Sequence, residues 1–161
     1  MDSSKTVTNT ISINASPKRV WAVLTEPFET KQYMFGCETV TDWKVESPLL
    51  WEAEYEGKKV VFVKGNILEI LPENLLRYSV IENNPPYADI LENHLIVQYD
   101  LTEKDGVTEL TVTQSGFENA AEGEKRYLDV YNNGLGWSPI LEKIKMQAEV
   151  QRTAKSTSSE F

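Results

Sequence analysis

Residues 119–151 read NAAEGEKRYLDVYNNGLGWSPILEKIKMQAEVQ, the longest segment of the chain with helical spacing. Apolar residues recur at roughly every third or fourth position from Tyr127 to Ala148, which is the spacing of one helix face. Residues 119–122 match the capping box that starts many helices, and Pro139 predicts a kink. We therefore expect one long helix here, after a chain that otherwise has the pattern of strands.

Most of the chain before this helix alternates between apolar and polar residues, which is the period of a β-strand. Gly65, inside the longest of these segments, predicts a bulge or a sharp bend. Two short helices follow the first strand, because Ser16 suits a helix N-cap and Pro17 and Pro27 suit first helical positions. Strands are expected over residues 6–14 (at a sheet edge), 51–56, 59–71, 76–80, 91–101 and 109–113.

This order of elements predicts an α+β fold. Short turns between alternating strands favour an antiparallel sheet, which would curve around the long C-terminal helix, with two short helices after the first strand. A length of 161 residues suits one domain. We expect that domain to cover residues 1–151 and a polar tail to cover residues 152–161. A sheet wrapped around a helix encloses a cavity, and a cavity indicates a ligand.

Composition argues against several classes of function. The net charge is −9 and the pI about 4.7, whereas nucleic acids and anionic membrane surfaces require clustered Lys or Arg. One cysteine, Cys37, and one histidine, His94, are too few for a typical zinc or iron site, so we expect no metal and no cofactor. No apolar run is long enough for membrane insertion, and the polar start MDSSKTVTNT lacks a signal sequence, so a cytoplasmic location is expected.

Residues on the expected inner faces of the sheet and the last helix are the candidate ligand-binding residues. Pockets combine apolar walls with a few polar groups, and tyrosine provides both. The candidates are Trp51, Tyr55, Phe62, Tyr78, Tyr99, Gln114, Tyr127, Tyr131, Gly134, Leu135 and Ser138. The aromatic candidates could equally fill the core. Gly134 could leave room for a ligand or allow the helix to pack closely on the sheet, and Gln114 needs a partner from protein, water or ligand.

No residue predicts catalysis. His94 alternates with Leu95 along its strand, so it is expected to face outward. Cys37 lies close to acidic residues, which oppose formation of a reactive thiolate. The three glutamates of residues 52–56 are expected to form a solvated strand face.

Four groups of residues carry a resemblance to a known family. They are Ser16-Pro17 with Val20-Trp21, Leu24-Thr25 and Pro27; Gly65 to Ile70 with Pro72, Leu76 and Tyr78; Thr108 to Val112 with Gln114, Gly116 and Phe117; and Gly136-Trp137 with Ile140-Leu141 and Ile144. Together they cover nearly the whole domain. The chain resembles the SRPBCC, or START-like, helix-grip superfamily, and within it the homologues of the activator of the ninety-kilodalton heat-shock protein ATPase. The resemblance implies the fold and its cavity, but no universal catalytic residue. Tyr33 stands where many members carry Trp.

These observations leave three hypotheses about function. The leading one is non-enzymatic binding of a small, mostly apolar molecule in the cavity, because no reactive group lies on the last helix. The second is a cavity enzyme of the cyclase or hydrolase type, which would need an acid or a base pointing into the cavity. The third, implied by the resemblance alone, is a stress-related co-chaperone-like module that binds a chaperone.

Overall fold

The computed structural model describes the backbone of residues 5–158 and the side chains of residues 5–149. Seven strands in this part of the chain form one antiparallel sheet, in the order β1-β7-β6-β5-β4-β3-β2. The strands are β1 (Val7–Ile13), β2 (Glu38–Val40), β3 (Pro48–Tyr55), β4 (Lys58–Leu71), β5 (Leu75–Glu82), β6 (Leu95–Lys104) and β7 (Val107–Ser115). The helices are α1 (Pro17–Thr25), α2 (Pro27–Tyr33), α3 (Gly123–Tyr131) and α4 (Ser138–Ser158), with short 3-10 turns η1 (Leu91–Asn93), η2 (Phe117–Asn119) and η3 (Asn132–Gly134).

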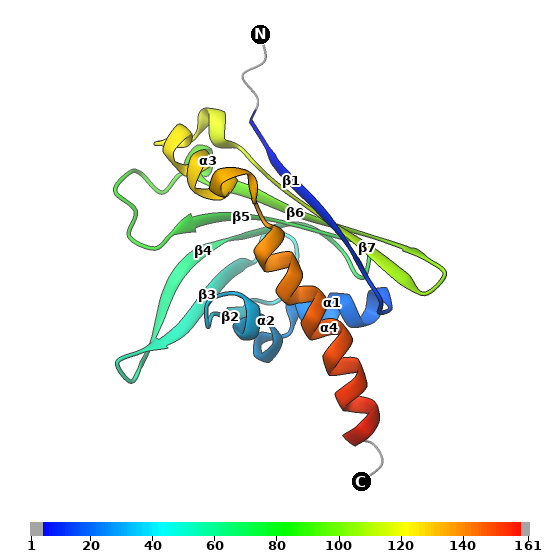
Figure 1. Cartoon of the computed structure of the whole chain (residues 1–161). Helices are drawn as coiled ribbons and strands as arrows, with labels where there is room; N and C mark the ends of the chain where they lie inside the picture. Colours follow the sequence, from blue (N-terminus) through cyan, green and yellow to red (C-terminus); the bar gives the residue numbers. More distant parts are fainter. Residues whose placement is uncertain (1–4, 159–161) are drawn as a thin grey trace.

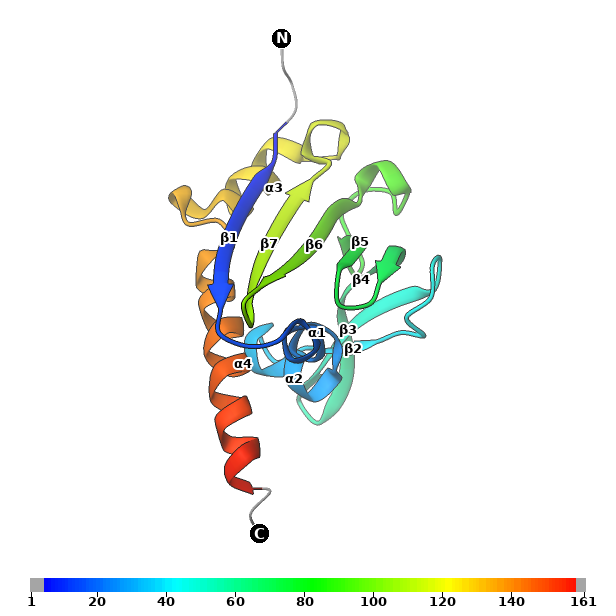
Figure 2. The same ribbon diagram turned by 90° about the vertical axis from the view of Figure 1, so that its right-hand side faces the viewer.

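The sheet is curved and open, with β1 and β2 at its edges. Figure 1 shows α4 crossing one face of the sheet, and Figure 2 shows α1 and α2 beside α4 at the lower end of the strands. The core lies between this face and the three helices, and it includes Leu141, Ile144 and Ala148 of α4. The α+β helix-grip fold expected from the sequence is confirmed, as is the edge position of the first strand.

A buried carboxylate joins the three helices that cover the sheet. Ser16 caps α1 by accepting a hydrogen bond from the Arg19 amide at 3.1 Å, and Pro17 follows it as expected. The Arg19 side chain pairs with Glu29 of α2 at 2.7 Å. Gln147 of α4 donates to the same carboxylate at 2.6 Å. Because Glu29 is buried, these charge-assisted bonds compensate the loss of its hydration and fix the helices relative to one another.

The bend of the sheet lies where β4 meets its neighbours. Pairing shifts register between Trp51 and Glu52 of β3, and again between Ile67 and Glu69 of β4. The expected irregularity near Gly65 is therefore present, with the register shift a few residues further along. Gly65 itself marks a close approach of backbones, since a Cβ atom there would lie 1.7 Å from the Ser79 carbonyl oxygen.

The prediction of one continuous helix over residues 119–151 is wrong. Helix α3 ends at Tyr131, and α4 begins only at Ser138. Between them, Gly134 and Gly136 have φ of 93° and 53°, left-handed values that glycine adopts without strain and that end helices. Pro139 therefore lies in the first turn of α4, where its missing N–H costs nothing, and does not kink a helix.

The capping box predicted at residues 119–122 is also absent. Asn119 ends η2, and Glu122, with φ of 55°, precedes α3 without a side-chain capping bond. The local sequence matches the pattern, but the chain turns sharply here because η2 is tied down by buried Phe117.

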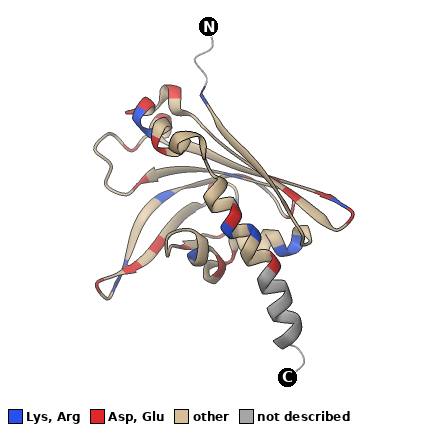
Figure 3. Ribbon diagram, in the orientation of Figure 1, with Lys and Arg blue, Asp and Glu red and all other residues tan. Residues whose placement is uncertain are grey.

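Charged residues gather at the hairpin ends and on the helices, and few lie in the middle of the sheet (Figure 3). None of the helices within residues 5–158 combines the length and apolarity of a membrane span. Helix α4 continues to Ser158, and residues 159–161 lie outside the described part of the chain. The division into a domain at 1–151 and a tail at 152–161 stays a prediction.

Candidate functional site

Four aromatic rings form a row across the inner face of the sheet. Trp51 of β3, Tyr78 of β5, Tyr99 of β6 and Trp137 just before α4 follow one another with ring centroids 6.0 Å apart at each step. The last pair is edge-to-face, at an interplanar angle of 87°. Spacings of this size are favourable for aromatic pairs. The row thus brings together three of the residues expected to bind a ligand, from three different strands.

Gln114 ends this row and has a protein partner. Its Oε1 accepts a hydrogen bond from the Trp137 indole at 2.9 Å, in a buried position. The Trp137 amide donates to Asn9 Oδ1 at 2.9 Å, which ties the start of α4 to β1. The question left open for Gln114 is therefore answered: a buried amide and a buried indole satisfy each other. Trp137 was not among the candidates, although its place directly after Gly134-Leu135-Gly136 was a usable signal.

Three buried tyrosines, Tyr33, Tyr78 and Tyr99, lie close enough for their phenols to affect one another's pKa. The hydroxyls of Tyr78 and Tyr99 lie 3.3 Å apart and form a hydrogen bond. Tyr33 of α2 is 1% exposed, and its hydroxyl has no hydrogen-bond partner among the described residues. Burial raises the pKa of Tyr33 and Tyr78 well above 10.0, and it raises the pKa of Tyr99 to about 12. All three phenols are therefore neutral near pH 7 and offer donors and acceptors in an apolar setting.

The space between sheet and helices is occupied by these side chains. Trp51, Tyr78, Tyr99 and Trp137 all belong to the hydrophobic core, each with 7% or less of its surface exposed. Three open pockets, with volumes of about 540, 410 and 360 Å³, lie elsewhere on the surface. None of these three is lined by the aromatic row. The residues expected to surround an open cavity are thus in contact with one another.

A second aromatic group lies at α3. Tyr127 packs edge-to-face on Phe117 at 5.3 Å and stacks on Tyr131 at 5.6 Å. Leu135 is half exposed beyond them, at 53%. Ser138 does not face the aromatic row, because its hydroxyl accepts a hydrogen bond from Asn9 at 3.3 Å. The candidates on the last helical segment therefore split between this group and the helix break that includes Gly134.

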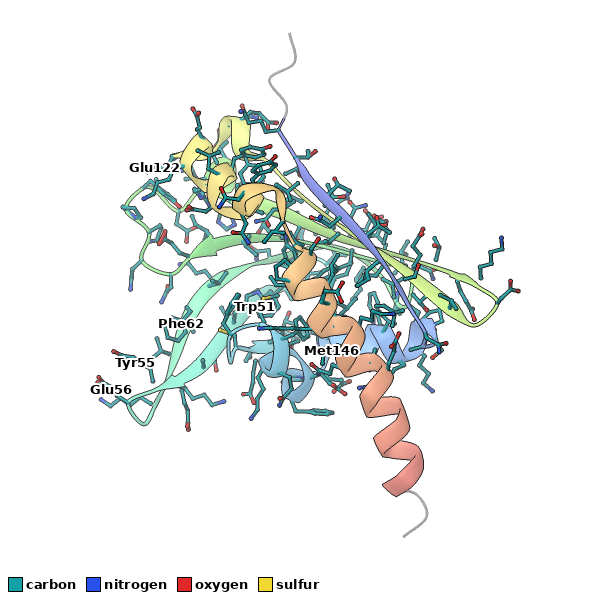
Figure 4. The ribbon with its side chains drawn as sticks, in the orientation of Figure 1. Trp51, Tyr55, Glu56, Phe62, Glu122 and Met146 are labelled. Atoms are coloured by element: carbon teal, nitrogen blue, oxygen red, sulfur yellow. The ribbon has the colours of Figure 1, made fainter. Side chains whose placement is uncertain are left out.

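Tyr55 and Phe62 lie apart from both groups. They occupy the outer part of the β3–β4 hairpin, where 59% and 43% of their surfaces are exposed (Figure 4). Trp51 lies on the same hairpin but further in, and is buried. The sequence predicted all three on the inner face of the sheet, because strand alternation does not show at which residues β3 and β4 extend beyond the core.

His94 faces outward from the sheet, as expected, but it is buried there. Its Nδ1 lies 3.0 Å from the Ser79 hydroxyl and its Nε2 lies 2.8 Å from Asp89 Oδ1. Lys64 also binds Asp89, at 2.9 Å, and together these contacts hold the pKa of Asp89 below its usual value. Because Leu95 points inward, His94 does face the other side of the sheet, but the loop of residues 83–93 covers it there.

The Ser79, His94 and Asp89 contacts have the composition of a hydrolase triad without its geometry. Ser79 is fully buried, and its hydroxyl also accepts a hydrogen bond from the Asn66 amide at 3.0 Å. A nucleophilic hydroxyl must reach its substrate, and this one does not. The inner face offers no better base, since the carboxylate of Glu29 is paired with Arg19. Burial raises the pKa of the Cys37 thiol, which keeps it in the unreactive form.

The family of the chain follows from its similarity to known proteins. A family model described as "Activator of Hsp90 ATPase homolog 1-like protein" matches residues 14–149. The chain belongs to this family. No curated protein sequence gives a significant match. The match begins just after β1, covers the other six strands and the helices α1 to α3, and ends within α4.

Solved structures agree with the family assignment. The solution structure of ChR145 from Cytophaga hutchinsonii is 30% identical with a TM-score of 0.70, and the alignment covers 95% of this chain and 99% of that one. The Aha1 dimer from Colwellia psychrerythraea is 14% identical, with a TM-score of 0.63 over 91% and 97% of the two chains. PFC0360w, an HSP90 activator from Plasmodium falciparum, is 15% identical, with a TM-score of 0.55 over 72% and 74%. The last two share the fold.

Proposed function

We propose that the protein binds a small, mostly apolar molecule that carries one hydrogen-bonding group, between the sheet and helices α2 and α4. The observation that carries this proposal is the buried Tyr33 hydroxyl, which has no hydrogen-bond partner within the described part of the chain and lies near the Tyr78–Tyr99 pair. A buried hydroxyl left unsatisfied costs about 1–3 kcal/mol. A ligand that supplies the missing partner recovers this free energy, which favours a molecule with a hydroxyl or carbonyl group.

The aromatic row supplies the apolar wall for such a ligand. Because its rings fill the space in the free protein, the ligand enters by displacing side chains, as at other pockets that form only on binding. Entry at the Trp137 end of the row would require the indole to give up its hydrogen bond to Gln114. The cavity enzyme is not favoured, because the one histidine lies on the opposite side of the sheet.

A matched pair of probes tests the proposal. Naphthol and naphthalene differ by one hydroxyl group, and the indole N–H signals of Trp51 and Trp137 report binding in an NMR titration. We expect naphthol to bind about five to ten times more tightly, the ratio produced by one net hydrogen bond of about 1 kcal/mol. Replacing Tyr33→Phe should bring the ratio close to one.

Tyr55→Phe is the control, because it removes a hydroxyl that is exposed on the hairpin. It should leave both affinities unchanged. Binding of both probes with equal affinity to the unaltered protein, or no change in the two indole signals, would contradict the proposal.

A second function, binding to a chaperone of the Hsp90 type, is supported by family membership and by the surface of α3. No residue of α3 is buried, and Leu128 and Tyr131, three residues apart on this helix, are 56% and 43% exposed. Exposed apolar side chains that lie close together suit a protein partner. The test is the ATPase rate of a purified Hsp90 with and without the chain. An increase that Leu128→Glu abolishes supports this function, and an unchanged rate counts against it.

A further inference from the structure

A groove of about 410 Å³ lies between α1 and the end of β4, away from the aromatic row. Trp21 forms one wall, and it shares a face of α1 with Lys18, three residues earlier. Trp43, from the loop between β2 and β3, and Ile70 of β4 form the other wall. Both indoles are partly buried against the core and line the groove. Two tryptophan side chains therefore border one small space.

Trp43 is held in an unusual backbone conformation. Its φ is 56°, in the left-handed region that a bulky residue rarely adopts. The loop is fixed around it by a bond from the Trp43 amide to Thr41 Oγ1 at 3.4 Å and by the contact of Thr41 with the Ser47 hydroxyl at 3.1 Å. Backbone bonds of Glu46 and Ser47 to Ile67 attach the loop to β4 at 2.7 and 3.0 Å. These bonds hold the loop, and with it Trp43, against β4 beside the groove.

Acidic residues outnumber basic residues along the groove. Glu26 at the end of α1 and Glu73 after β4 line it, and both are exposed. Neither carboxylate forms an ion pair with any residue that the structure describes, and neither does Lys18. Two carboxylates and one ammonium give the groove one net negative charge. A cation is therefore favoured and an anion disfavoured.

We propose that this groove binds an alkylated ammonium group, such as a trimethylammonium, between Trp21 and Trp43. The faces of two indoles attract a cation through their quadrupoles, and tryptophan is the most effective of the aromatic residues in this role. The methyl groups contact the rings and Ile70, while Glu26 and Glu73 balance the charge. An ordinary ammonium is more strongly hydrated than its methylated form, so the apolar walls favour methylation. This site is independent of the proposed interior site, with which it shares no residue.

Choline and dimethylbutanol, its uncharged carbon analogue, are the probes. Each probe is titrated into the protein while the NMR signals of the tryptophan indole N–H groups are recorded. Choline should shift the signals of Trp21 and Trp43 and leave the signals of Trp51 and Trp137 unchanged. Choline should bind at least fivefold more tightly than dimethylbutanol. Trp43→Phe should weaken choline binding about threefold, because phenylalanine is a poorer partner for a cation.

Glu73→Gln tests the charge without altering the core, since this side chain is exposed. It should weaken choline binding about threefold and reduce its dependence on salt. Glu109→Gln, an exposed carboxylate on β7 outside the groove, should change neither. Equal affinities for choline and dimethylbutanol, or choline affinity unchanged by Glu73→Gln, would overturn the proposal. So would choline shifts confined to Trp51 and Trp137, which would instead indicate the interior site.

Discussion

Gly65 lies where the backbones of β4 and β5 approach too closely for any side chain. A Cβ atom at this position would be 1.7 Å from the Ser79 carbonyl oxygen and 2.5 Å from its carbon. Backbone atoms cannot give way as a flexible side chain would, so the strands must separate. We expect Gly65→Ala to lower the free energy of unfolding by about 3 kcal/mol or more, measured by urea denaturation.

Gly57→Ala provides the comparison for this substitution. Gly57 has φ of 80° in the β3–β4 turn, and a Cβ atom there meets nothing within 4 Å. Only the backbone strain of a left-handed alanine remains, which costs about 1–2 kcal/mol. Equal losses at the two positions would show that the contact with Ser79 is not what requires glycine at position 65.

Single residues of the inner face could be predicted from the sequence only where strand alternation fixes the side of the sheet. Tyr78 and Tyr99 were found this way, since each alternates with polar neighbours in a central strand. Tyr33 was missed as a site residue because it lies on a seven-residue helix, whose contacts depend on how α2 docks. His94 was placed on the correct side of the sheet, but its burial depends on a loop whose path has no periodic signal.

The loop of residues 83–93 is the element that His94 holds against the sheet. The imidazole links Asp89 of this loop to Ser79 of β5, and Asn93 binds the Ala88 carbonyl at 2.8 Å. The substitution His94→Ala removes the hydrogen bonds of the imidazole to Ser79 and Asp89. The buried Ser79 hydroxyl then has one hydrogen-bond partner fewer. We expect a loss of about 2–3 kcal/mol in the free energy of unfolding, together with faster amide hydrogen exchange in the loop.

Asp89→Asn separates the hydrogen bond from the charge in this link. The amide oxygen of asparagine still accepts the bond from the His94 ring, so the loop should stay protected from exchange. Asp89 is itself half exposed, and its ion pair with Lys64 contributes little. A loss of protection in Asp89→Asn as large as in His94→Ala would contradict the role given to the imidazole.

The last helical segment shows how far element boundaries follow from the sequence. The periodicity of residues 119–151 indicated helix correctly, but it hid the break, because Tyr131 and Leu135 are four residues apart and Leu141, Ile144 and Ala148 resume the same spacing after it. The break is fixed by contacts with β1, since a Cβ atom at Gly136 would lie 2.4 Å from Asn9 Oδ1. Such a contact joins residues more than a hundred positions apart, and no local pattern reports it.

For the whole molecule, the buried phenols predict how stability depends on pH. The pKa of Tyr33 and Tyr78 in the fold lies well above the 10.0 of a free phenol, and that of Tyr99 is raised to about 12. Above pH 10 the unfolded chain loses these protons while the folded chain keeps them. The stabilisation is therefore complete below pH 10 and is lost as the pH rises toward the folded pKa values.

The expected slope follows from proton linkage. Each tyrosine that is ionised only in the unfolded chain lowers the free energy of unfolding by about 1.4 kcal/mol per pH unit, so three together give about 4. Urea denaturation at a series of alkaline pH values measures this slope. Tyr33→Phe removes one of the three groups and should reduce it by about a third, whereas Tyr55→Phe, at an exposed position, should leave it nearly unchanged. A slope that is the same in the two variants would mean that the Tyr33 phenol titrates in the folded protein, and therefore that water reaches the hydroxyl cluster on which ligand binding is proposed to depend.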